Sequence, residues 1–153
     1  MRHRYRGRVT GILIVNAAAT WFMAGVIWIV QLVHYPLFAR VGGDGFPAYH
    51  AAHSARISLV VGPAMLVEAA TAVLVALARP DGVAAWAAWL GVGLVAVTWL
   101  ATALLAVPQH GRLSTGFDAG AHRRLVVGNW VRTAAWSARG VLVAVMLASA
   151  VPG

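Results

Sequence analysis

Histidine is the residue type in this chain whose placement most strongly suggests chemistry. Five of the six histidines lie near the ends of long apolar segments, at positions 34, 50, 53, 110 and 122. If those segments are antiparallel helices, all five lie at the end of the bundle opposite the N-terminus. An imidazole titrates near neutral pH and is a common ligand of transition metals. The histidines therefore predict a proton-transfer or cofactor site at that end.

The cofactor interpretation names a particular ligand set, with copper, iron, zinc or a haem as the group bound. The ligands would be His34, His50, His53 and His110, with His122 as a further candidate. His50 and His53 are spaced i, i+3, so their rings share a face if that segment is helical. In the alternative interpretation these polar rings only collect in loops and at interfaces, and no cofactor is bound. The sequence leaves both interpretations open.

Three charged residues lie inside the apolar segments: Glu68, Arg132 and Arg139. A charge near the middle of a bilayer costs about 2.5–3.5 kcal/mol on insertion scales, so such residues face the bundle interior and need partners. Counted from the expected helix starts at 1.5 Å per residue, Glu68 lies about 16 Å deep, between Arg132 at about 10 Å and Arg139 at about 21 Å. We predict that Glu68 pairs with one of the two arginines, either as a structural pair or within an anion or proton site.

A polar face on the last apolar segment indicates where a small molecule would bind. Asn129, Arg132, Trp136 and Arg139 follow a 3-4-3 spacing, which places them on one side of a helix that must face inward.

Further pocket residues are expected from the first and third segments, which contribute Trp28, Gln31, Tyr35, Trp99 and Thr102. We expect these side chains to bind a flat, mostly apolar molecule with one or two oxygens, together with Trp136 and Arg139. The catalytic candidates beside it are His110, Asn129, Arg132 and Glu68.

Four long apolar runs must position these residues, at about 9–35, 57–78, 83–107 and 125–150. Each exceeds the roughly 20 residues that a helix needs to cross a bilayer. The chain of 153 residues is 61% hydrophobic and only 10% charged, which excludes a water-soluble monomer and a disordered chain. We predict a single all-α transmembrane domain over 1–153, an up-down-up-down bundle of four helices. Pro36 and Pro108 are expected to end helices, and 79–82 to form a tight turn.

The distribution of charge indicates which partners the chain has and how it is oriented in the membrane. The 12 basic residues are all arginine and the net charge is +8, which we attribute to anionic lipid head groups and membrane topology rather than to nucleic acid. The absence of cysteine excludes disulfides, iron–sulfur clusters and thiolate chemistry. Four arginines at positions 2, 4, 6 and 8 precede an uncleaved first helix. They predict a plasma (inner) membrane protein with both termini in the cytoplasm. A homo-oligomer stays open.

Two stretches carry a family resemblance. The residues Val107-Pro108-Gln109-His110-Gly111-Arg112-Leu113, followed by Asn129-Trp130-Val131-Arg132-Thr133, resemble motifs of the small four-helix membrane proteins that include the anthrone-oxygenase-like proteins. Pro36 matches a proline that this family has shortly after its first helix. The chain departs from the family by having His110 where an asparagine is usual. The resemblance implies a membrane-embedded oxygenase or a relative of one. In such an enzyme Asn129 and Arg132 would stabilise a phenolate or enolate, and His110 would act as base.

Three classes of function follow from these observations. The first is an oxygenase-like or oxidoreductase-like protein that binds a lipophilic phenol or quinone. The second is a metal- or haem-binding membrane protein that uses the histidines. The third is a non-catalytic membrane partner or assembly protein, in which the buried polar residues only hold the bundle together.

Overall fold

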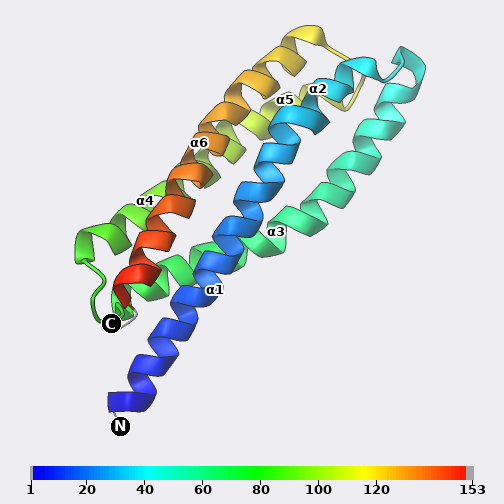
Figure 1. The fold of residues 1–153 in the computed structure, drawn as a ribbon. Helices are drawn as coiled ribbons and strands as arrows, with labels where there is room; N and C mark the ends of the chain where they lie inside the picture. The colour runs from blue at the N-terminus through cyan, green and yellow to red at the C-terminus, as the bar shows by residue number, and fades with distance from the viewer. Residues whose placement is uncertain (1, 151–153) are drawn as a thin grey trace.

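The computed structural model describes the backbone of residues 2–150 and the side chains of residues 9–150. Within this part of the chain the structure contains helices and turns and no strand, which confirms the all-α prediction. Figure 1 shows long helices running back and forth, with the start of α1 and the end of α6 at the same end of the bundle. The main helices are α1 (Arg2–Ile29), α3 (Phe46–Ala78), α4 (Ala85–Ala101) and α6 (Ala119–Ala150).

Four segments are long and apolar enough to cross a membrane: Val9–Arg40, Gly43–Ala78, Ala85–Leu113 and Ala119–Ala150. Their outer surfaces carry large apolar side chains such as Leu59 and Leu77, which are 77% and 70% exposed. Such a surface is stable when it faces lipid rather than water. The chain is therefore a multi-pass membrane protein that forms a four-helix bundle.

The helices are longer than the sequence predicts, and the two prolines do not end them. The first span continues past Ile29 through a π-helical turn, η1 (Val30–His34), into α2 (Tyr35–Leu37) and the 3-10 turn η2 (Phe38–Arg40). The third span continues through a second π-helical turn, η4 (Thr102–Ala106), into α5 (Val107–Leu113).

Each proline stands in the first turn of the helix that follows a π turn, at Pro36 in α2 and Pro108 in α5. A proline inside a helix removes one N–H donor and its ring crowds the preceding turn. A π turn is wider than an α turn and relieves this crowding. The expectation that Pro36 and Pro108 stop their helices was therefore wrong, because the backbone changes its hydrogen-bond spacing instead of ending.

The second and fourth spans also begin earlier than expected. After the 3-10 turn η3 (Gly43–Gly45), α3 starts at Phe46 rather than at about residue 57, and α6 starts at Ala119 rather than at about residue 125. At the start of α6 the Ala121 N–H donates to Asp118 Oδ1 over 2.7 Å. This hydrogen bond is the main cause that lowers the pKa of Asp118, which acts as the helix cap. The early starts change the depth of every residue that the sequence places by counting.

The tight turn predicted at 79–82 is confirmed. The Val83 N–H donates to the Pro80 carbonyl over 3.2 Å, and Gly82 has a φ of +82°. A Cβ at Gly82 would overlap the Ser149 carbonyl oxygen, so the turn packs directly against the end of α6. Only glycine fits this conformation and this contact.

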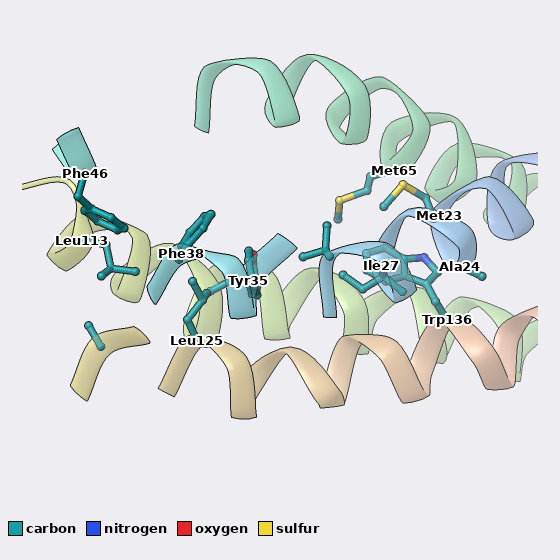
Figure 2. Close-up of a cluster of buried hydrophobic side chains, with 13 residues drawn as sticks. Met23, Ala24, Ile27, Tyr35, Phe38, Phe46, Met65, Leu113, Leu125 and Trp136 are labelled. Atoms are coloured by element: carbon teal, nitrogen blue, oxygen red, sulfur yellow. The ribbon is translucent and has the colours of Figure 1, made fainter. Parts of the chain in front are cut away.

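The buried side chains form two groups along the bundle axis. Figure 2 shows that rings from Tyr35, Phe38 and Phe46 gather at one end, near Leu113 and Leu125. In the same figure the side chains of Met23, Ala24, Ile27, Met65 and Trp136 continue the core toward the middle. A separate cluster that includes Leu13, Val75 and Met146 closes the other end. The ring-rich end is the end that holds the histidines.

Candidate functional site

Glu68 forms the central ion pair of the bundle, with Arg139 on α6. Arg139 Nε donates to Glu68 Oε1 over 2.7 Å, and both side chains are 1% exposed. The Thr20 hydroxyl donates to the same oxygen over 2.8 Å, and Trp136 Nε1 donates to Oε2 over 2.9 Å. Both carboxylate oxygens are therefore engaged, as a buried charge requires.

The other two nitrogens of Arg139 have hydrogen-bond partners as well. Its Nη1 donates to the Gly91 carbonyl over 2.6 Å, and its Nη2 donates to Asn16 Oδ1 over 2.9 Å. Asn16 in turn donates to the Glu68 carbonyl and to Thr71 Oγ1. The network thus connects α1, α3, α4 and α6. Its polar groups bind one another, which is the arrangement of a network that holds helices together.

The prediction that Glu68 pairs with an arginine is confirmed, and the corrected helix starts explain the choice of Arg139. Glu68 lies 22 residues into α3, or about 33 Å along it, and Arg139 lies 20 residues into α6, or about 30 Å. Arg132 lies only about 20 Å from the start of α6. The counts of about 16, 10 and 21 Å expected from the sequence are too short, because the helices start earlier than the sequence suggests.

Arg132 has no carboxylate partner among residues 9–150, so it is the surplus charge of the bundle. Its Nη1 donates to Asn129 Oδ1 over 3.1 Å, and Asn129 donates to Gln31 Oε1 over 2.8 Å. Its guanidinium lies 5.3 Å from the ring centre of Trp136. Its Nε is buried and has no hydrogen-bond partner.

The histidines that the sequence places at one end do meet there. His34 Nε2 lies 2.7 Å from His53 Nδ1, and His50 Nε2 lies 3.0 Å from His110 Nδ1. His110 Nε2 lies 3.0 Å from the Tyr35 hydroxyl, and His122 Nε2 donates to the Tyr35 carbonyl over 2.7 Å. Phe38, which is fully buried, contacts the rings of His34, His50, His53 and His122.

The histidines are arranged for hydrogen bonding with one another. Ligands about 2.0–2.1 Å from a tetrahedral zinc stand roughly 3.3 Å apart, with all lone pairs aimed at one point. The ring nitrogens of the pairs His34–His53 and His50–His110 instead face each other at 2.7 and 3.0 Å. Residues 9–150 contain no group of three or more histidine, aspartate or glutamate side chains placed to hold a metal ion. The predicted ligand set of His34, His50, His53 and His110 is thus gathered, but as hydrogen-bonded pairs.

A cavity of about 130 Å³ lies between these histidines and Arg132. The polar residues in its lining are Tyr35, His53, Ser58, Thr102, His110 and Arg132. The rest of its lining is mostly apolar, from residues such as Met23, Ile27, Val61 and Ala106. This combination of an apolar enclosure and a few convergent polar groups is typical of a small-molecule site.

Two polar atoms of the cavity's own side chains have no partner. His53 Nε2 and Arg132 Nε are both buried and unbonded, although most buried polar atoms in proteins are satisfied. Arg132 Nε always carries a proton and so offers a donor. His53 Nε2 offers a donor when His34 donates to His53 Nδ1, and an acceptor when the proton sits on Nδ1. The cavity therefore presents one fixed donor and one exchangeable proton site.

Several residues predicted for the pocket lie elsewhere. Trp28 and Trp99 are 41% and 40% exposed and line none of the cavities described here, so they do not form its walls. Trp28 donates instead to Ser137 Oγ, on the outer surface. Glu68, Trp136 and Arg139 belong to the ion-pair network. Asn129 accepts a hydrogen bond from Arg132 and donates one to Gln31, so these two amides hold Arg132 in place.

Sequence reasoning missed Asn16 and Thr20, which complete the network around Glu68 and Arg139. Their i, i+4 spacing within an apolar helix was the signal that one polar face of the first span looks inward. It also missed Ser58, which is among the residues that line the cavity.

Comparisons with protein families, with characterised proteins and with solved structures find no match for this chain. The fold and the cavity therefore have to carry the functional interpretation by themselves.

Proposed function

We propose that this membrane protein binds a lipophilic phenol or quinone-like molecule in the cavity formed by Tyr35, His53, His110 and Arg132. The observation that carries the proposal is the pair of unpartnered buried nitrogens, His53 Nε2 and Arg132 Nε, in the walls of an otherwise apolar cavity. A buried unsatisfied polar group costs about 1–3 kcal/mol, which a bound oxygen at this position would offset.

The charge of the site favours an electronegative group. Arginine and histidine are the titratable side chains around the cavity besides Tyr35, and none of its lining residues is acidic. Among residues 9–150 the buried carboxylate is Glu68, and it is already paired with Arg139. A carbonyl or phenolate oxygen would receive a hydrogen bond from Arg132 and be stabilised by its positive charge.

The chemistry that this geometry supports begins with a proton transfer. A phenolic hydroxyl placed in the cavity gives its proton to the unpartnered Nε2 of His53, and the phenolate remains beside Arg132. His53 Nδ1 lies 2.7 Å from His34 Nε2, so the ring that takes the proton has a hydrogen-bonded neighbour. Both ring nitrogens of His110 already have partners at 3.0 Å, the Tyr35 hydroxyl and His50. Such activation is the first step of an oxygenase-like or oxidoreductase-like reaction, the class that the resemblance to anthrone-oxygenase-like proteins also suggests.

The test is a binding measurement on the full chain in lipid nanodiscs. We expect 2,3-dimethoxy-5-methyl-1,4-benzoquinone to bind, and Arg132→Gln and His53→Phe each to weaken it about tenfold, the value of one lost hydrogen bond to a charged group. Arg123→Gln is the matched control, because Arg123 is exposed and lies outside the cavity. Arg132→Lys keeps the positive charge at this position. If Arg132→Gln loses quinone binding and Arg132→Lys does not, the loss comes from the missing charge and not from misfolding.

Two results would overturn the proposal. One is no binding of the quinone to the folded protein, and the other is binding that neither cavity substitution weakens. Elemental analysis of the same preparation separates the cofactor alternative. Stoichiometric copper, iron or zinc, or the absorbance of a haem, would assign the histidines to that group instead.

A further inference from the structure

A second hollow adjoins the cavity on its lipid-facing side. This groove has a volume of about 410 Å³ and lies between the first span and α3. It is lined by apolar residues that include Ile29, Ala52 and Val60, and its polar members are His34, Tyr49, His53 and Arg56. Figure 1 shows that α1 and α3 cross and then diverge toward the end at which α3 begins, where the α3 residues of the groove lie.

The groove and the cavity share part of their walls. Val26, Val30, His53 and Ile57 line both, so only these side chains separate the two spaces. His53 is the residue whose Nε2 lacks a partner. A molecule whose oxygen reaches this nitrogen therefore has the groove directly behind it.

The two volumes differ in a way that bears on the size of the ligand. Ordinary ligand pockets measure roughly 300–1,000 Å³. The cavity, at about 130 Å³, is smaller than this range and suits a single ring or less, whereas the groove, at about 410 Å³, falls within it. A ligand that fills both spaces has a compact oxygenated head and a longer apolar remainder.

We propose that the ligand is a lipid: a single-ring phenol or quinone with an apolar chain, which moves in sideways from the bilayer between the first span and α3. The ring oxygen reaches His53 and Arg132 in the cavity, and the chain lies along the groove over Ala52, Ile57 and Val60. This inference rests on the proposed function and specifies its substrate class. Neither the cavity nor the groove has an acidic residue in its lining, so the site complements an electronegative head and not a cationic one.

The experiment compares two probes with the same head, 2,3-dimethoxy-5-methyl-1,4-benzoquinone and its 6-decyl derivative, on the full chain in nanodiscs. We expect the decyl probe to bind about tenfold more tightly at equal mole fraction in the lipid. The gain is modest because a chain in lipid is already in an apolar medium and gains only packing contacts.

Groove-filling variants locate the chain. We expect Ala52→Trp to remove the advantage of the decyl probe and to leave binding of the short probe unchanged, because Ala52 lines the groove and not the cavity. Val60→Trp serves the same purpose if Ala52→Trp does not fold. Leu59→Trp is the control, since Leu59 lies on the same helix, is 77% exposed and lines neither space.

The outcomes separate this inference from the proposed function. If the short probe binds and the decyl probe gains nothing, or if Leu59→Trp acts as Ala52→Trp does, the lipid-chain inference is overturned and the cavity site stands. If neither probe binds to folded protein, both the proposed function and this inference fail.

Discussion

Glu68 shows how one buried carboxylate determines the roles of two arginines. It is fully buried and accepts hydrogen bonds from Thr20, Trp136 and Arg139. Because Arg139 takes this partner, Arg132 remains without a carboxylate partner among residues 9–150, which leaves its charge available to the ligand that we propose. The same residue therefore stabilises the bundle and leaves the neighbouring site positively charged.

The first prediction concerns this ion pair. Glu68→Gln or Arg139→Gln alone is expected to lower the free energy of unfolding by about 3–5 kcal/mol, because each leaves an uncompensated buried charge. The double substitution should cost less than the sum of the two single losses. Thermal melts in a mild detergent measure this, with Arg123→Gln as an exposed control. Additive losses would show that the two residues do not act as a pair.

The second prediction concerns the hydroxyl of Tyr35, which contacts His110 at 3.0 Å. Tyr35→Phe leaves His110 Nε2 without this partner and is expected to cost about 1–3 kcal/mol of folding stability. Tyr49→Phe is the matched control, because the Tyr49 hydroxyl makes no hydrogen bond among the described residues. Equal melting temperatures for the two variants would contradict the predicted role of Tyr35.

At the scale of the elements, the turn between α3 and α4 is the most constrained connection. Gly82 combines a positive φ with close contact to the Ser149 carbonyl. This contact fixes the end of α6 against the turn.

The third prediction follows from that contact. Gly82→Ala is expected to lower the free energy of unfolding by at least about 1–3 kcal/mol, since the left-handed conformation is strained for alanine and the turn must also move. Gly43→Ala should have a much smaller effect, because a Cβ at Gly43 meets nothing within 4 Å. Chemical or thermal unfolding of both variants provides the comparison, and a Gly82→Ala protein as stable as the parent would refute it.

The elements also show which parts of the fold the sequence can predict. The number of spans and the turn at 79–82 follow from hydropathy and turn composition, which act locally. The starts of α3 and α6 do not, because 46–56 and 119–124 contain histidine, arginine and small residues that interrupt the apolar runs from which the spans were counted. In the structure the start of α3 packs against the first span. The ring contacts of Phe38 with Phe46 and His50 are an example of such packing.

At the scale of the whole molecule, the topology of the bundle explains why the sequence predicts where the site lies but not which side chains line it. Alternating helices bring His34, His50, His53 and His110 to one end, so their meeting was predictable. Whether Trp28 and Trp99 face the cavity or the lipid depends on helix rotation and on the π turns, which hydropathy does not reveal. Both tryptophans are about two-fifths exposed.

The fourth prediction concerns orientation and uses the absence of cysteine from the chain. With both termini cytoplasmic, Thr115→Cys should react with a membrane-impermeant maleimide in intact cells, and Ala84→Cys only after permeabilisation. Thr115 and Ala84 are exposed and lie in or beside connections at opposite ends of the bundle. The reverse labelling pattern would show that the termini lie outside.

The two π turns have a consequence for how this chain tolerates insertions and deletions. A π turn holds one residue more than the α-helical turn it replaces. In a regular α-helix, one residue corresponds to about 100° of rotation around the axis. Removing a single codon within 30–34 would thus restore a regular α-helix in the first span without shortening it appreciably. Side chains beyond the deletion would keep their present faces, because the π turn holds its extra residue within about one turn of rotation, and Tyr35 would still face His110. A one-residue deletion inside α1, where the helix has no extra residue, would instead rotate the rest of the span by about 100° and separate Tyr35 from His110. The two π turns are therefore the places in the first and third spans where the chain can lose a residue with the least disturbance of the site.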